Sequence, residues 1–426
     1  MQHDPWYFEK KITPKGIELW HKEMPELDWY GIGVIVFAGH RQDPAHLNNL
    51  SHFVEHCIVD AERPHWRTRG EREEYMLTHG IIESQGFATT VDYMWTAIKA
   101  VRATAGLSYL HDIFRLPPSA IDPEKPKRIV EREKKERGTD DERTIARAIW
   151  KNILPEAHPL VRYYDSAGVA RMLEQVTLDD ALTHWKNHYT HKNTVLVSIG
   201  KISATEMAQL VDLYFVQDAD EVGMGERYRA VPLIETDLPR PKELHLHVSE
   251  ILGHHHYDKN ISPEVLVLRP RALPHVSNAA RYMLKRTLGS SLFERLREQK
   301  KLVYSAPVRN ELYQDIAIHR LTMNCGREQV NEILAETKRL RMIVEEEGRE
   351  IFEREKREAL LGLDLEEETA SSLLADAMYD LALHGKIELK LQYLEQLHEV
   401  TFEQTLAAVE DCFGEGKATI LSITPD

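Results

Sequence analysis

Two histidines and a glutamate near the N-terminus have the types and spacing for metal-assisted chemistry. His52, Glu55 and His56 spell H-x-x-E-H, the reverse order of the H-E-x-x-H zinc motif. Residues four apart on an α-helix project from one face, so the two imidazoles converge and supply half of a tetrahedral zinc site. Glu55 shares that face and, as a base, can take a proton from an attacking water molecule.

The pattern also has a plainer interpretation. The chain contains 22 histidines, so a five-residue match can arise from composition alone, and both side chains can be satisfied core or surface groups. Cys57 follows His56 but points about 100° away around a helix, so we interpret it as structural. Motifs elsewhere in the sequence are needed to choose between a metal site and this plainer interpretation.

The surrounding sequence predicts the elements that would position these groups. A β-rich run over 30–40 ends in glycine, and the cap-type residues Asn48, Asn49 and Ser51 precede or open the predicted helix. The stretch 81–98 predicts two strands around a glycine-containing bend. A long, charged helical stretch covers 123–154, and its plain interpretation is a solvated helix with ion pairs along its surface.

Composition excludes several classes of function. With 426 residues the chain is too long for one ordinary core, and 42% hydrophobic and 29% charged residues are typical of a globular protein. A net charge of −15 argues against nucleic-acid binding. No apolar run approaches about 18 residues, so no membrane span is expected. Three cysteines without a pairing pattern, and no secretory signal, lead us to expect a cytoplasmic protein.

The order of predicted elements repeats once along the chain. We place a first half-domain at 1–216, a linker rich in acidic residues, glycine and proline at 217–242, and a second half-domain at 243–426. Each half reads as strands, a helix, a strand pair, long helices and a closing strand. The apolar runs 194–200 and 417–423 take the closing position in the two halves. The sequence therefore predicts a duplicated α+β unit.

Two separate signatures give the chain a resemblance to a known family. The first is His52-Phe53-Val54-Glu55-His56 after a strand, with a glutamate-rich helix roughly 75 residues further on, and the second is the segment 289–305, which contains Arg297 and Tyr304. Together they resemble the pitrilysin-type zinc metallopeptidases (M16), and the length resembles the short bacterial two-domain type related to mitochondrial processing peptidase. The resemblance implies two similar α/β-sandwich half-domains (LuxS/MPP-like), each with a mostly antiparallel sheet packed with helices.

The resemblance also implies a third zinc ligand on the charged helix. Glu133, with 76 residues between it and His56, fits the family spacing. Glu131 is the rival, and the two glutamates differ by about 200° around a helix, so only one can face the metal. The family often has a second glutamate seven residues before the ligand. That position is Pro126 for Glu133 but Glu124 for Glu131, so both assignments stay open.

Two further features correspond to substrate-binding residues of the family. Arg297 and Tyr304, seven residues apart, match a pair that stabilises the tetrahedral intermediate and holds the peptide. The plain alternative is an arginine in a surface ion pair and a tyrosine on a core strand. In the predicted strand pair, Gln85 stands where the family usually has asparagine. An edge strand there could bind an extended peptide through its backbone, although a core hairpin is the plain alternative.

These features lead to one main functional expectation and one alternative. We expect a zinc-dependent endopeptidase in which His52, His56 and Glu133 hold Zn²⁺ and Glu55 is the general base. By resemblance, two copies would form a homodimer that closes around peptides or small unfolded proteins, with Arg297 and Tyr304 of one copy facing the zinc of the other. The alternative is a non-catalytic structural or peptide-binding subunit of M16 type.

Overall fold

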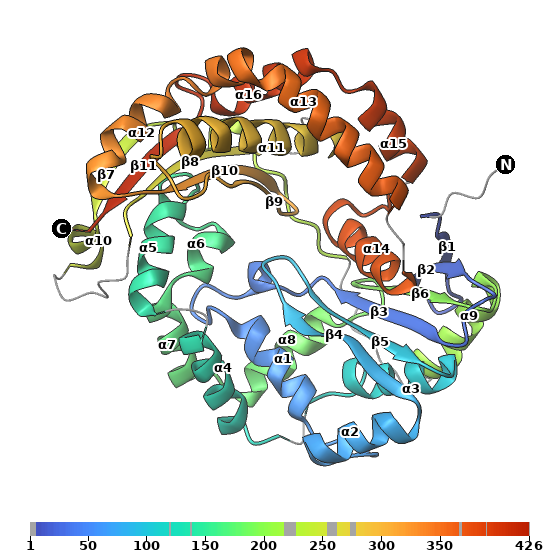
Figure 1. The fold of residues 1–426 in the computed structure, drawn as a ribbon. Helices are drawn as coiled ribbons and strands as arrows, with labels where there is room; N and C mark the ends of the chain where they lie inside the picture. Colours follow the sequence, from blue (N-terminus) through green and yellow to red (C-terminus); the bar gives the residue numbers. More distant parts are fainter. Residues whose placement is uncertain are drawn as a thin grey trace. The chain divides into compact units, whose positions relative to one another are not determined.

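The chain folds into two compact units that exchange segments. The computed structural model describes residues 6–118, 121–136, 139–216, 227–253, 262–272, 278–365, 369–388 and 390–425. Unit 1 comprises Met1–Gly138, Ser166–Ala230 and Glu368–Leu389, and unit 2 comprises Thr139–Asp165, Val231–Glu367 and Lys390–Asp426 (Figure 1). The units are therefore not two contiguous halves. Segment 139–165 of the first half packs in unit 2, and segment 368–389 of the second half packs in unit 1. Of the predicted linker 217–242, residues 217–226 lie outside the described part.

Unit 1 is built on a six-stranded sheet in the order β1-β2-β6-β3-β5-β4. Only β2 and β6 are parallel, and every other neighbouring pair is antiparallel. The strands are β1 (Glu9–Ile12), β2 (Glu18–Glu23), β3 (Tyr30–Val36), β4 (Ile81–Thr89), β5 (Met94–Ala100) and β6 (Thr194–Gly200).

Helices pack against both faces of the unit 1 sheet. One face contributes Ile32, Val34 and Leu196 to a core shared with helices α1 and α3, and the other contributes Ile35 and Val197 to a core shared with α14. The helices of unit 1 are α1 (Leu50–Asp60), α2 (Arg69–Thr78), α3 (Ala103–Phe114), α4 (Glu124–Glu136), α7 (Ser166–Gln175), α8 (Leu178–His188), α9 (Ala204–Leu210), α14 (Ala370–His384), and the short helices η1 (His40–Gln42) and η2 (Val211–Phe215).

The central strand β3 shows why its sequence is almost continuously apolar. All seven of its residues are buried, because both sides of the strand are covered. Gly33 lies directly under Met378 of α14, and a Cβ atom at this glycine would collide with the methionine sulfur. The glycine therefore lets α14, which belongs to unit 1, approach the sheet closely.

The predicted glycine bend between β4 and β5 is wrong. Gly86 lies inside β4, in a region of irregular pairing between Gln85 and Ala88. The chain reverses instead at Thr90–Tyr93, where Thr90 N–H donates to the Tyr93 carbonyl (2.8 Å) and the Thr90 hydroxyl accepts from the backbone N–H of Asp92 (3.3 Å). A threonine side chain thus stabilises this turn, where the sequence pattern predicts a glycine.

Unit 2 repeats the strand arrangement of unit 1 without its first strand. Its sheet has the order β7-β11-β8-β10-β9, and the closing strand β11 is parallel to β7 and antiparallel to β8, as β6 is to β2 and β3. This match confirms the predicted α+β class with two similar, mostly antiparallel half-domains. The strands are β7 (Glu243–His247), β8 (Glu264–Ala272), β9 (Val308–Leu312), β10 (Ile316–Asn324) and β11 (Thr419–Thr424).

The helices of unit 2 enclose a second apolar core. Val265 and Val267 of β8 and Met323 of β10 pack with residues of α11, α13 and α16, which lie along the sheet in Figure 1. The helices are α5 (Asp140–Lys151), α6 (Pro159–Tyr163), α10 (Val248–Leu252), α11 (Asn278–Leu292), α12 (Val330–Thr337), α13 (Leu340–Leu365), α15 (Lys390–Glu399), α16 (Phe402–Phe413), and the short helices η3 (Glu235–Asp237), η4 (Phe293–Gln299) and η5 (Arg327–Gln329).

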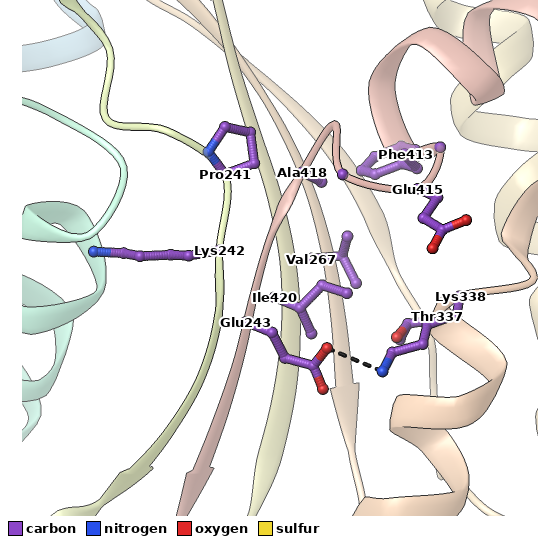
Figure 2. Close-up of a pocket in the computed structure, with 12 residues that line it drawn as sticks. Pro241, Lys242, Glu243, Val267, Thr337, Lys338, Phe413, Glu415, Ala418 and Ile420 are labelled. Carbon is purple, nitrogen blue, oxygen red and sulfur yellow. Dashed lines mark ion pairs between the residues drawn. The ribbon is translucent and has the colours of Figure 1, made fainter.

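Unit 2 also contains a cavity of about 220 Å³ beside β7 and β11. Its lining includes the apolar side chains of Val267 and Ile420, and Glu243 forms an ion pair with Lys338 across it (3.0 Å; Figure 2). None of the site residues predicted from the sequence lines this cavity. Across the described part of the chain, no helix has both the length and the apolar character needed to span a bilayer.

Candidate metal centre

Helix α1 carries the H-x-x-E-H segment deep inside unit 1. Every residue from Leu50 to Ile58 is buried, and the helix packs against α3, α4, α8 and β4. Phe53, Val54 and Ile58 are fully buried and belong to the main core of unit 1. Because its apolar side chains are enclosed, the helix holds its polar residues in a fixed orientation.

The structure brings His52, His56 and Glu133 together. Nε2 of His52 lies 3.2 Å from Nε2 of His56, and Oε2 of Glu133 lies 3.1 Å from Nε2 of His52. Oε1 of the same carboxylate lies 3.5 Å from Nε2 of His56. Two imidazoles from α1 and one carboxylate from α4 thus converge, although 76 residues separate Glu133 from His56.

The orientation of α4 separates the two candidate glutamates. Pro126 and Val130 form its buried side, and Glu133 lies three residues after Val130, on nearly the same side of the helix. Glu131 is exposed and pairs with Lys135 (3.0 Å). The helix therefore presents Glu133 to the histidines and Glu131 to solvent.

The three donor groups fit a zinc ion in number, type and spacing. Ligand atoms 2.0–2.1 Å from a tetrahedral zinc ion are about 3.3–3.4 Å apart. Here the two Nε2 atoms lie 3.2 Å apart, and the two oxygens of Glu133 lie 3.1 Å and 3.5 Å from Nε2 of His52 and Nε2 of His56, respectively. Burial, together with the neighbouring His52, lowers the pKa of His56, which favours the neutral imidazole that binds metals. The side chain of Glu133 is 25% exposed, which leaves the cluster open on that side.

Glu55 is a second carboxylate beside the histidines, with a different partner. Ligand-type atoms of His52, Glu55 and His56 all lie within 4.8 Å of one another, so these three residues alone could also be considered as a ligand set. However, Oε2 of Glu55 accepts a hydrogen bond from the hydroxyl of Thr89 on β4 (2.6 Å). Glu133, by contrast, contacts both Nε2 atoms. We therefore favour Glu133 as the third donor and Glu55 as the neighbouring base.

Three residues that contact this cluster or anchor its helix are not predicted as part of the site from the sequence, although Asn49 is named there as a cap-type residue. Thr89 holds Glu55, the amide of Asn49 lies against His52, and Asp43 accepts hydrogen bonds from the first residues around the start of α1. The polar residues within 48–51 predict a helix start, but they do not indicate which hydrogen-bond partner each side chain has. Thr89 carries no local signal, because its contact joins β4 to α1.

Arg297 and Tyr304 also lie together, within unit 2. The guanidinium of Arg297 donates to the backbone carbonyl of Tyr304 (2.7 Å) and lies over its ring, 4.6 Å from the centroid. The same guanidinium also lies over the ring of Phe293, 5.1 Å from its centroid. Tyr304 is 76% exposed, so its phenol is presented to solvent, unlike a tyrosine on a core strand.

An ion-pair network centred on the buried Glu336 contacts the helix that carries Arg297. Arg295 of η4 pairs with Glu336 (2.9 Å) and Glu347 (2.8 Å), and Lys300 pairs with Glu336 (2.8 Å). Glu336 is buried, and its charge is compensated by these two cations together with Arg339 (3.5 Å). The network fixes η4 on both sides of Arg297.

The strand that carries Thr89 lies at the edge of its sheet. β4 is the last strand in the order of the unit 1 sheet and pairs only with β5 among the described strands. Gln85, near its middle, is exposed, and its carbonyl accepts from the Thr96 hydroxyl (2.9 Å). The outer backbone edge of β4 therefore has no strand partner among the described residues.

Comparison with known proteins adds information on the fold. No family model matches the sequence, and no curated protein matches it. Solved structures do match along nearly the whole chain. A protease from Helicobacter pylori has a TM-score of 0.78 and 15% identity, with 98% of this chain and 99% of that chain covered. A Pseudomonas fluorescens peptidase M16 inactive domain has a TM-score of 0.75 and 15% identity, with 98% of each chain covered.

The chain has the fold of the M16 peptidases. The first half of the periplasmic protease PqqL from Escherichia coli agrees with this, with a TM-score of 0.73 and 14% identity over 99% of this chain and 92% of that one. At such low identity, the similarity establishes the architecture predicted from the sequence. It does not carry over activity, since one of these M16 structures is described as inactive.

Proposed function

We propose that this chain is a zinc-dependent endopeptidase. The observation that carries the proposal is the convergence of His52, His56 and Glu133, whose donor atoms lie 3.1–3.5 Å apart, next to a carboxylate held by Thr89. A set of two histidines and one glutamate leaves a fourth position of a tetrahedral zinc ion open, which is the pattern of catalytic zinc sites.

Each residue of the cluster has a defined task in the proposed reaction. His52, His56 and Glu133 would hold the ion, which when bound supplies Lewis-acid activation of water and polarises the scissile carbonyl. Glu55 takes a proton from the attacking water and passes it to the leaving amine. The hydrogen bond from Thr89 keeps one oxygen of Glu55 fixed, so the other oxygen is oriented for proton transfer.

Substrate binding in this proposal uses backbone and side-chain groups. An extended peptide would add to the edge of β4, where main-chain hydrogen bonds tolerate many sequences. We further propose that two copies form a homodimer enclosing a chamber, which admits peptides or small unfolded proteins. In that dimer, Arg297 and Tyr304 of one copy would donate hydrogen bonds at the zinc site of the other.

The proposal is tested with a quenched-fluorescent peptide library on the zinc-loaded, full-length protein. We expect hydrolysis that a chelator abolishes and added zinc restores. Glu55→Gln should retain zinc, but its rate of peptide hydrolysis should fall by about 10²–10⁴-fold, because the proton acceptor is gone. Glu62→Gln, at an exposed glutamate just beyond α1, is the matched control and should keep full activity. Full activity in Glu55→Gln would exclude the assigned base.

A second candidate function is a non-catalytic structural or peptide-binding subunit. It is favoured by the similarity to the M16 domain described as inactive. The same library separates the candidates, because a binding protein would retain peptides and zinc without releasing fluorescence. Zinc-independent capture of peptides, with no cleavage after zinc loading, would favour this second function.

A further inference from the structure

Asn49 has an unusual backbone conformation directly before the helix that carries the histidines. Its φ is 79° and its ψ is 17°, in the left-handed region that asparagine enters more readily than most residues. Its side chain does not cap α1 by accepting from the first helical N–H groups. Instead, the amide lies against the imidazole of His52, with Nδ2 of Asn49 3.3 Å from Nδ1 of His52.

The turn that carries Asn49 is anchored independently of its side chain. Oδ2 of the buried Asp43 accepts from the backbone N–H of Asn49 (2.8 Å). Oδ1 of Asp43 accepts from the backbone N–H of Ser51 (2.7 Å) and from its hydroxyl (2.5 Å). The amide of Asn49 can therefore be removed while these main-chain anchors of the turn remain.

The position of this amide bears on which nitrogen of His52 is protonated. Nε2 of His52 faces His56 and Glu133, so a metal there requires an unprotonated Nε2 and a proton on Nδ1. That Nδ1–H needs an acceptor, and the Asn49 carboxamide is the group in contact with it. A half-turn of the carboxamide exchanges its nitrogen and oxygen with little change in distance.

We propose that Asn49 is a positioning residue for the metal centre. Its amide oxygen accepts the Nδ1 proton of His52, selects the tautomer that leaves Nε2 for the ion, and fixes the plane of the ring. This inference rests on the proposed metal site, and it assigns a task to a side chain that takes no part in the reaction itself.

Replacement by glycine distinguishes this task from a purely conformational one. If Asn49 were present only because it tolerates a positive φ, Asn49→Gly would leave zinc affinity unchanged. It would keep or raise the unfolding temperature, since glycine adopts this conformation without steric cost. If the amide orients His52, the same variant loses metal affinity without losing stability. Asn49→Asp should preserve the function, because aspartate also tolerates this region and its carboxylate accepts the Nδ1 proton.

The test measures the zinc dissociation constant of full-length variants by competition with a chromophoric chelator, together with thermal unfolding of the metal-free proteins. We expect Asn49→Gly to unfold at or above the wild-type temperature and to bind zinc about 10–100-fold more weakly. Asn49→Asp should bind within a few-fold of wild type or more tightly. Lys301→Gly, at the other described non-glycine residue with positive φ (56°), is the matched control and should leave zinc affinity unchanged.

The possible outcomes separate this inference from the metal site on which it rests. Equal zinc affinity in wild type and Asn49→Gly would overturn the role of Asn49 while leaving the metal site intact. Asn49→Asp binding as weakly as Asn49→Gly would overturn it as well, since an acceptor would then be without effect. Wild-type protein whose zinc affinity is unchanged by His52→Ala would overturn the metal site itself, and the role of Asn49 with it.

Discussion

The orientation of helix α4 determines whether Glu133 or Glu131 faces the two histidines. Spacing to His56 favoured Glu133, while the glutamate seven residues earlier favoured Glu131. Ile129 and Val130 stand four and three residues before Glu133, so a helix that buries them also turns Glu133 inward. The structure has Val130 fully buried and Glu133 beside both histidines. The apolar periodicity of the helix was thus the signal in the sequence that points to Glu133.

Paired substitutions on α4 test this assignment. Glu133→Gln should weaken zinc binding by at least about 100-fold, because losing a ligand costs more than losing one of the partners that orient ligands. Glu131→Gln should leave zinc affinity unchanged and alter the free energy of unfolding by less than about 1 kcal/mol, since it removes only an exposed pair with Lys135. Chelator competition and thermal unfolding measure both quantities. A larger loss of affinity in Glu131→Gln would reverse the assignment.

Some residues at the cluster could not be recognised from sequence. His52, Glu55 and His56 are linked by helix periodicity, which is local, so their shared face was predictable. Thr89 reaches Glu55 from a strand 34 positions away, and its role depends on how β4 packs against α1. Such contacts arise from tertiary packing and leave no periodic trace in one sequence.

At the scale of elements, the position of α1 depends on the connection that follows β3. Gly39 lies in this connection, its carbonyl oxygen lies 2.7 Å from the Ser51 hydroxyl oxygen, and the β4–β5 turn packs directly against it. A Cβ atom at Gly39 would lie 2.5 Å from the backbone nitrogen of Tyr93 and 2.6 Å from the carbonyl oxygen of Thr90. These are main-chain atoms, so they cannot move aside as a flexible side chain could.

We therefore expect Gly39→Ala to lower the free energy of unfolding by about 1–3 kcal/mol through overpacking, and to weaken zinc binding by displacing the start of α1. Gly70→Ala is the control. Gly70 lies in α2 with nothing within 4 Å of an added Cβ, so alanine there should be neutral or stabilise by about 0.5–1 kcal/mol. Denaturant unfolding of the metal-free proteins measures both effects. Equal stabilities would show that the connection can relax.

Helix α14 carries a carboxyl group whose ionisation opposes folding. Burial raises the pKa of Asp380 to about 6, and the nearby Glu388 and Asp376 carboxylates act in the same direction. The backbone N–H of Glu388, which donates to Asp380 (2.9 Å), opposes the rise only in part. The folded state thus binds this proton more tightly than the unfolded chain, so stability should fall as pH rises from about 4 to about 6.

Asp380→Asn should remove this dependence. We expect the variant to be more stable than wild type by on the order of 1 kcal/mol at pH 7.5, and the difference to vanish near pH 4, where the wild-type carboxyl is protonated in the fold. Glu350→Gln, at an exposed position of α13, controls for the general loss of one negative charge. Thermal unfolding across this pH range measures the effect, and a gain independent of pH would contradict the proposed cause.

The elements also show where sequence patterns succeed and fail. The sequence predicts that the closing runs 194–200 and 417–423 are equivalent, and β6 and β11 take the same place in their sheets. The sequence does not predict the turn at Thr90–Tyr93, because a threonine hydroxyl takes the place of the expected glycine. The packing of Glu368–Leu389 in unit 1 was also not foreseen. Its amphipathic pattern indicates a buried face but does not tell which sheet covers it.

At the scale of the whole molecule, we propose a homodimer in which each copy completes the other's site. The cytoplasmic location expected from the cysteines is a separate proposal. Mixing two inactive variants tests the dimer. Chains with Glu55→Gln keep Arg297 and Tyr304, and chains with Arg297→Ala and Tyr304→Phe keep Glu55. If sites form between copies, a mixed dimer has one complete site, so an equal mixture that re-equilibrates should regain about a quarter of wild-type activity. No recovery, with mixed dimers verified by mass spectrometry, would contradict shared sites.

The most direct test of the central claim is a crystal structure of the zinc-loaded protein with anomalous data collected at the zinc edge. We expect one strong anomalous peak per chain, about 2.0–2.1 Å from Nε2 of His52, Nε2 of His56 and a carboxylate oxygen of Glu133. Glu55 should remain outside bonding distance of the ion and keep its hydrogen bond to Thr89. A peak elsewhere, or one bound by Glu131 or Glu55 in place of Glu133, would contradict the account.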